Sequence, residues 1–116
     1  WDSWPWNLHA YWDGIIDVAN PKGDDVEDFE YYLSNAEMIK TKHPKSEFNG
    51  LIDLQDSQVW NNEGKEITMK KVYPEDLKQN EQPSEEYKEM AYNMAQKRMA
   101  LSGYRMAEFL NEIFGK

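Results

Sequence analysis

The amino-acid sequence predicts an all-α protein, with about four helices packed as a bundle in a single helical domain over residues 1–116. Apolar residues recur every three or four positions over long stretches, which is the spacing of a core-facing helix. Residues that favour the start of a helix precede several of these stretches. The Asn49-Gly50 pair is typical of a hairpin turn, but no alternating strand pattern flanks it.

The first predicted helix runs from about Leu8 to Val18. Asn7 is a suitable N-cap, because its side-chain oxygen can accept hydrogen bonds from the first free amides of the helix. Gly14 weakens this helix by up to about 1 kcal/mol relative to Ala. The turn residues 20–23 are expected to end it.

The second predicted helix begins at Asp24 and ends near Lys42. The carboxylates at its start complement the positive end of the helix dipole. Its core-facing stripe is predicted to consist of Val26, Phe29, Leu33 and Ala36. His43 directly precedes Pro44, and we expect its side chain to be exposed or to stabilise the carboxyl end of the helix.

Residues 46–49 are predicted to form a turn or a helix start, and residues 51–71 one helix with a bend near residues 61–64. Trp60 and Glu63 lie in this third helix. Core packing is the role that we predict for both side chains.

The last predicted helix covers Glu85 to about Phe114 and follows a polar surface loop at residues 73–83. Ser84 is its expected N-cap. Its wide apolar face comprises Tyr87, Met90, Met94, Leu101, Tyr104, Met106, Leu110 and Ile113. A core stripe is the preferred interpretation of this face, and an adaptable partner groove is the alternative. Arg98 and Arg105 could pair with acidic groups inside the bundle.

A candidate metal site lies in the first predicted helix, at His9 and Asp13. Residues four apart on a helix project from one face, and an imidazole nitrogen and a carboxylate oxygen are both zinc ligands. Catalytic zinc sites usually have three protein ligands and a water, so these two residues predict a partial site. An ordinary pair on a solvated helix face is the alternative interpretation.

The pattern Asn-Leu-His-x-x-Trp-Asp at residues 7–13 resembles a sequence of the zinc-dependent single-strand nucleases and 3′-nucleotidases, the S-one/P-one nuclease family. In that family the His and the Asp of this pattern bind one zinc of a three-zinc cluster. The resemblance therefore implies that His9 and Asp13 are metal ligands, and that this chain holds at most one of the three zinc ions in part.

Two further stretches resemble the same family in the same order. Residues 60–63 with Val72-Tyr73 are similar to its Trp-x-x-Glu helix, which closes with Val-Tyr. Residues 97–111 are similar to its terminal helix. The resemblance implies the later helices of the phospholipase C/P-one nuclease fold and the carboxyl-terminal part of a larger nuclease domain. Trp1 is not taken as the family's zinc-chelating Trp, because the residues that follow it do not fit.

The composition limits the classes of partner. The chain carries 22 acidic and 13 basic residues, for a formal net charge of -9, whereas duplex-binding proteins usually show a basic stripe. A zinc nuclease can bind phosphate through its metal ions instead. The chain has no cysteine and no apolar run long enough to predict a membrane span. A secreted or periplasmic location follows from the resemblance alone.

Two functions are compatible with these observations. The first is a zinc-dependent phosphodiesterase that hydrolyses single-stranded DNA or RNA and has 3′-nucleotidase activity, with the remaining ligands on a missing amino-terminal part of the same domain. This chain alone is then expected to be inert. The second is a metal-free helical interaction or structural module related to the nucleases.

Overall fold

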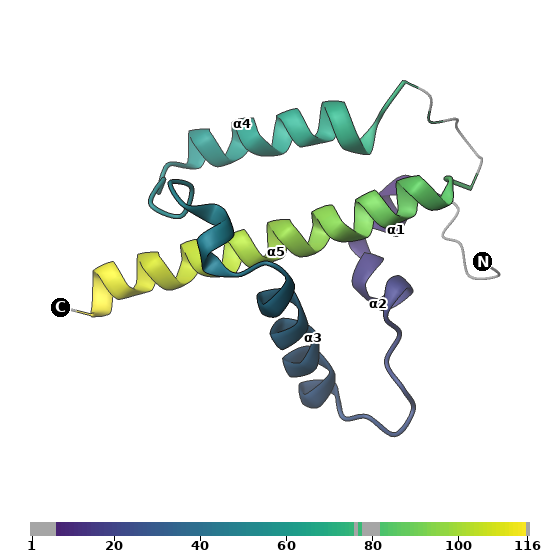
Figure 1. The fold of residues 1–116 in the computed structure, drawn as a ribbon, viewed down its shortest axis with the longest axis horizontal. Helices are drawn as coiled ribbons and strands as arrows, with labels where there is room; N and C mark the ends of the chain where they lie inside the picture. Colours follow the sequence, from purple (N-terminus) through teal and green to yellow (C-terminus); the bar gives the residue numbers. More distant parts are fainter. Residues whose placement is uncertain (1–6, 76, 78–81, 116) are drawn as a thin grey trace. The chain divides into compact units, whose positions relative to one another are not determined.

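The computed structural model describes residues 7–75, 77 and 82–115, and these residues confirm the all-α fold class (Figure 1). They contain α-helices, one 3-10 helix and one π-helix, and no strand. In chain order these are α1 (Leu8–Asp13), α2 (Ile15–Ala19), α3 (Asp28–Lys42), η1 (Lys45–Phe48), α4 (Ser57–Ile67), η2 (Thr68–Val72) and α5 (Glu85–Phe114). Residues 1–6, which include Trp1, and part of the predicted loop at residues 73–83 lie outside the described residues.

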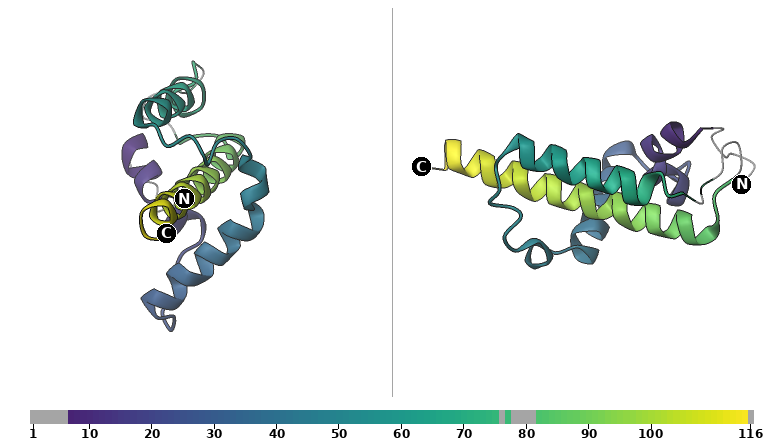
Figure 2. Two further views of the ribbon diagram at one scale, coloured as in Figure 1. Left: turned by 90° about the vertical axis from the view of Figure 1, so that its left-hand side faces the viewer. Right: turned by 90° about the horizontal axis from the view of Figure 1, so that it is seen from above.

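The chain forms two compact units. The first comprises residues 1–21 and 58–95, and the second comprises residues 22–57 and 96–116. Helix α5 contributes its first part to one unit and the rest to the other, and Figure 2 shows it as an uninterrupted helix. No helix in the described part of the chain is both long and apolar enough to cross a membrane.

The first unit has an apolar core between its amino-terminal helices and α5. Its buried members are Tyr11, Ile15, Tyr87 and Ala91. The prediction of one helix over residues 8–18 is wrong, because Gly14 separates α1 from α2. The backbone at Gly14 leaves helical geometry with φ -103° and ψ 14°. Its N–H still donates to the Ala10 carbonyl at 3.1 Å, so the interruption is local.

Helix α3 differs from the prediction in its start and in its buried face. It begins at Asp28, not Asp24, because residues 24–26 form a turn. The predicted stripe is exposed, with 74% of Phe29 accessible to solvent. The buried face instead consists of Tyr31, Asn35 and Ile39, spaced by four residues. A polar residue at the centre of this face hid it from a prediction based on apolar spacing.

The prediction of one helix over residues 51–71 is also wrong. The chain forms η1, then a turn, and α4 begins only at Ser57. Gly50 has φ +83°, a left-handed conformation that ends helical geometry and favours glycine. Phe48 and Ile52 on either side of it are buried.

We expect Gly50→Ala to lower the free energy of unfolding by about 1 kcal/mol, because L-residues are disfavoured in the left-handed region. No atom lies within 4 Å of the added Cβ, so the backbone angle alone is tested. Gly103→Ala is the matched control, since this helical glycine also has open space around it. The control should stabilise the protein by about 0.5–1 kcal/mol. Urea unfolding followed by circular dichroism measures both, and a loss of equal size in both variants would contradict the assignment.

Helix α5 confirms its predicted bounds and its N-cap. The Tyr87 amide donates to Ser84 Oγ at 3.1 Å. The predicted apolar face is buried at Tyr87 and Leu101 but exposed toward the end of the helix, at Met106, Leu110 and Ile113. The prediction of a continuous core stripe is therefore wrong for the last three turns.

Candidate functional site

The candidate metal ligands His9 and Asp13 lie on α1. The Ala10 amide donates to Asn7 Oδ1 at 2.7 Å, which confirms the predicted N-cap and fixes the start of the helix. His9 Nε2 lies 3.0 Å from Asp13 Oδ2, and the two side chains are 85% and 70% exposed. The structure therefore brings the two predicted residues together on a solvent-facing side of α1.

This pair fits part of a zinc site. His9 Nε2 and Asp13 Oδ2 lie at the distance of an ion pair between the two side chains, and both atoms are of the kinds that bind zinc. Among the described residues, no group of three or more His, Cys, Asp or Glu side chains could hold a metal ion. His9 and Asp13 could thus supply two ligands to a zinc ion whose other ligands come from outside the described residues.

The opposite side of α1 is held by the core of the first unit. Tyr11 is buried there, and its burial, with Tyr87 nearby, raises its pKa to about 12. Trp12 Nε1 donates to the Tyr87 hydroxyl at 3.0 Å, and that hydroxyl donates to the Val72 carbonyl at 2.8 Å. Burial raises the pKa of Tyr87 as well, which favours the protonated phenol that donates to Val72. The sequence predicted an apolar position for Tyr87 and missed the role of its hydroxyl.

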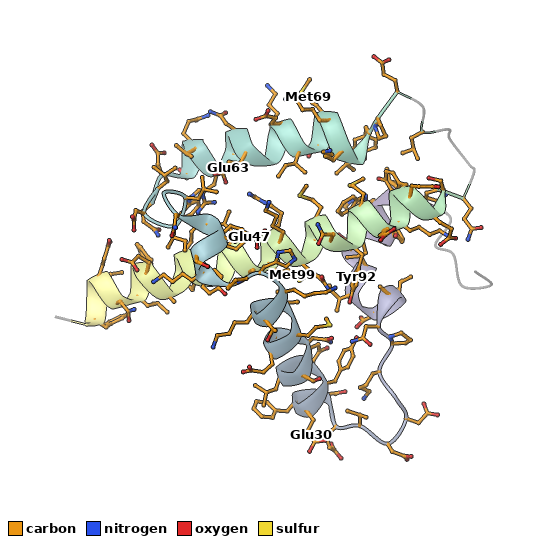
Figure 3. The ribbon with its side chains drawn as sticks, viewed as in Figure 1. Glu30, Glu47, Glu63, Met69, Tyr92 and Met99 are labelled. Atoms are coloured by element: carbon orange, nitrogen blue, oxygen red, sulfur yellow. The ribbon has the colours of Figure 1, made fainter. Side chains whose placement is uncertain are left out.

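The residues of the two later stretches on which the family resemblance also rests lie outside α1. Trp60 and Glu63 are half-buried on α4, and Figure 3 labels Glu63. Their packing role stays a prediction. Arg105 is buried, and its Nε donates to the Leu51 carbonyl at 3.1 Å. Its guanidinium is therefore used in part to hold the turn after η1.

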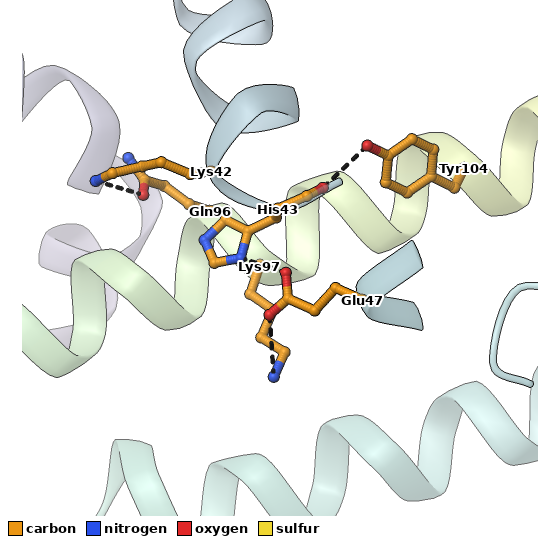
Figure 4. Close-up of polar contacts among 6 residues, drawn as sticks. All are labelled: Lys42, His43, Glu47, Gln96, Lys97 and Tyr104. Atoms are coloured by element: carbon orange, nitrogen blue, oxygen red, sulfur yellow. Dashed lines mark hydrogen bonds and ion pairs between the residues drawn. The ribbon is translucent and has the colours of Figure 1, made fainter. Parts of the chain in front are cut away.

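A second polar cluster surrounds His43 in the second unit (Figure 4). His43 is the C-cap of α3 as predicted, but it is only 5% exposed. Its Nδ1 lies 2.9 Å from Glu47 Oε2, and the Tyr104 hydroxyl donates to its carbonyl at 2.9 Å. Glu47 also pairs with Lys97 at 3.7 Å. The sequence predicted the helix end but not this enclosure by η1 and α5.

Comparison with known proteins adds the family. A model of the S1/P1 Nuclease family matches residues 1–115. No curated protein and no solved structure matches the chain. The family match extends over nearly all of the sequence, including the α1 pattern that contains His9 and Asp13. The chain therefore belongs to the S1/P1 nuclease family.

Proposed function

We propose that this chain supplies His9 and Asp13 as two ligands of one zinc ion in a nuclease that hydrolyses single-stranded DNA or RNA and has 3′-nucleotidase activity. The carrying observation is the 3.0 Å contact between His9 Nε2 and Asp13 Oδ2 on the exposed face of α1. The family match supports a nuclease function in general. A secreted or periplasmic location is part of this proposal.

The chemistry follows from the two donor atoms. His9 binds through a neutral imidazole nitrogen, and Asp13 adds a negative charge that favours a divalent cation. Zinc ions in such a centre supply an activated water and stabilise the charge on phosphate oxygens. The task of α1 is to keep both ligand atoms on one face and in one orientation. The net charge of -9 makes metal ions, not basic side chains, the main attraction for phosphate.

The site requires further ligands. A catalytic zinc ion usually has three protein ligands, and the described residues supply only this pair. We expect an amino-terminal part of the same domain to provide the others. The 116-residue chain alone is then inert toward nucleic acid.

Zinc content and hydrolysis of single-stranded DNA test this proposal. The purified chain should retain close to one zinc per chain, which His9→Ala and Asp13→Ala both remove. Asp17→Ala is the matched control, since Asp17 is an exposed carboxylate on the next helix, α2. It should retain the metal.

Activity is measured after an upstream segment of the gene product is added to the chain. We expect hydrolysis only in the mixture, and His9→Ala should lower it at least about 100-fold. That exceeds the roughly 10–100-fold loss typical when only a hydrogen-bond partner of a ligand is removed. If the chain alone hydrolyses single-stranded DNA and His9→Ala abolishes this activity, the site on this chain is not incomplete. If the mixture with His9→Ala is as active as the wild-type mixture, His9 is not a metal ligand.

A metal-free helical module is the second candidate function. The lack of a third ligand among the described residues and the exposed apolar side chains of α3 favour it. A wild-type chain that binds no zinc, together with no activity after the upstream segment is added, would support this alternative.

A further inference from the structure

The ligand helix α1 depends on the rest of the first unit for its conformation. It contains six residues, and isolated helices shorter than about 12–15 residues are marginal in water. The contact between His9 and Asp13 exists only while these residues are helical. Tertiary contacts of α1 must therefore maintain the geometry of the pair.

These contacts are of two kinds. Tyr11 and Ile15 fill the apolar core of the unit, and burial of apolar surface has no directional preference. Trp12 adds a directional contact, because its indole N–H donates to the Tyr87 hydroxyl. The two rings also meet edge to face, with centroids 6.4 Å apart at 89°.

Trp12 lies beside the ligand face of α1. At 100° per residue, it is about 60° around the helix from His9, and it directly precedes Asp13. The Tyr87 hydroxyl is itself anchored, since it donates to the Val72 carbonyl of η2 and belongs to the 30-residue helix α5. One hydroxyl thus connects α1 with η2 and α5.

We infer that Tyr87 is a positioning residue, whose hydroxyl holds α1 docked through Trp12 and so keeps His9 and Asp13 arranged for one zinc ion. The metal part of this inference rests on the proposed function, whereas the docking of α1 does not. Loss of one such hydrogen bond should favour local opening of α1 by about threefold to tenfold.

Amide hydrogen exchange tests the docking without metal. In Tyr87→Phe, the Gly14 amide, which donates to the Ala10 carbonyl at the end of α1, should exchange about threefold to tenfold faster. The interior amides of α5 should be unchanged. Trp12→Phe removes the donor instead of the acceptor, and it provides the same test if Tyr87→Phe does not fold. Because the two residues share one bond, the double variant should accelerate exchange by less than the product of the two single effects.

Two controls separate positioning from general destabilisation. Tyr73→Phe removes the hydroxyl of an exposed tyrosine in the same unit and should leave the exchange of the Gly14 amide unchanged. Glu89→Gly weakens α5 at an exposed position and should lower the midpoint of unfolding without affecting that exchange. Additive effects of Trp12→Phe and Tyr87→Phe, or equal acceleration in Glu89→Gly, would overturn the inference.

Release of bound zinc to a chelator provides the second readout. If the ligands leave the ion through opening of α1, release from Tyr87→Phe should be faster by the same factor as amide exchange. A wild-type chain that binds no zinc would count against the proposed function, and amide exchange would still decide the docking role. Accelerated exchange with unchanged zinc release would overturn the part of the inference that concerns the ligands.

Discussion

Phe48→Ala should destabilise the second unit by about 3–5 kcal/mol, the usual cost of removing a buried aromatic ring. Phe48 is only 1% exposed and is among the largest fully buried side chains. Its ring lies 5.9 Å from that of Tyr104, whose hydroxyl holds the His43 carbonyl. Since small proteins are stable by only about 5–15 kcal/mol, this variant should be largely unfolded at moderate urea concentrations.

Urea unfolding followed by circular dichroism measures this loss. Tryptophan fluorescence adds a probe of the first unit, because all five tryptophans belong to residues 1–21 and 58–95. Phe48→Leu, which retains more of the volume, should cost less. Phe109→Ala is the exposed control, at 46% exposure, and should change the stability by no more than about 0.5 kcal/mol. If Phe48→Ala were as stable as Phe109→Ala, the buried position of Phe48 would be wrong.

The protein should lose stability on the alkaline side, between about pH 10 and pH 12. Burial raises the pKa of Tyr11 from 10.0 to about 12 in the folded state. The folded protein therefore holds this proton more tightly than the unfolded chain does. The resulting stabilisation is fully present below pH 10 and is lost as the pH rises through about 12. At 1.36 kcal/mol per pKa unit, the loss is on the order of 2 kcal/mol.

Tyr87 acts in the same direction, because burial raises its pKa too. Urea unfolding at pH 8, 10 and 11.5 measures the effect. Tyr11→Phe should remove a large part of the decline between pH 10 and 11.5, whereas Tyr32→Phe, which affects an exposed tyrosine, should not. Lysines also titrate in this range, so the comparison between these two variants carries the result. Equal slopes in both would contradict the assignment to Tyr11.

The sequence correctly predicted those structural features that depend on residues close together in the chain. The N-caps Asn7 and Ser84 were predicted correctly, because capping is a contact over three residues. Gly14 was expected only to weaken its helix, yet it ends α1, since two short helices pack against the core where one was predicted. The third predicted helix begins later than expected, at Ser57, because the turn that contains Gly50 with its left-handed angle extends to residue 53. Backbone angles at single glycines depend on tertiary packing and cannot be derived from apolar spacing.

In the candidate site, too, contacts between residues close in sequence were predicted and contacts between distant residues were not. His9 and Asp13 are four residues apart, so helical geometry sufficed to predict that they lie together. Their role as zinc ligands stays a prediction. The contact of Trp12 with Tyr87 joins residues 75 positions apart, and no local pattern indicates it. His43 was placed correctly at a helix end, but the sequence predicted neither its burial nor the hydrogen bond to its carbonyl from Tyr104, 61 positions away.

The outward-facing apolar residues of α3 have a consequence for the colloidal behaviour of the protein. Phe29, Tyr32 and Leu33 face solvent beside the carboxylates that begin the helix. At neutral pH the net charge of -9 keeps molecules apart. Near the isoelectric point of about 4.6 this repulsion vanishes. The exposed apolar side chains of α3 then promote association between molecules, and the solubility of the protein has its minimum in mild acid.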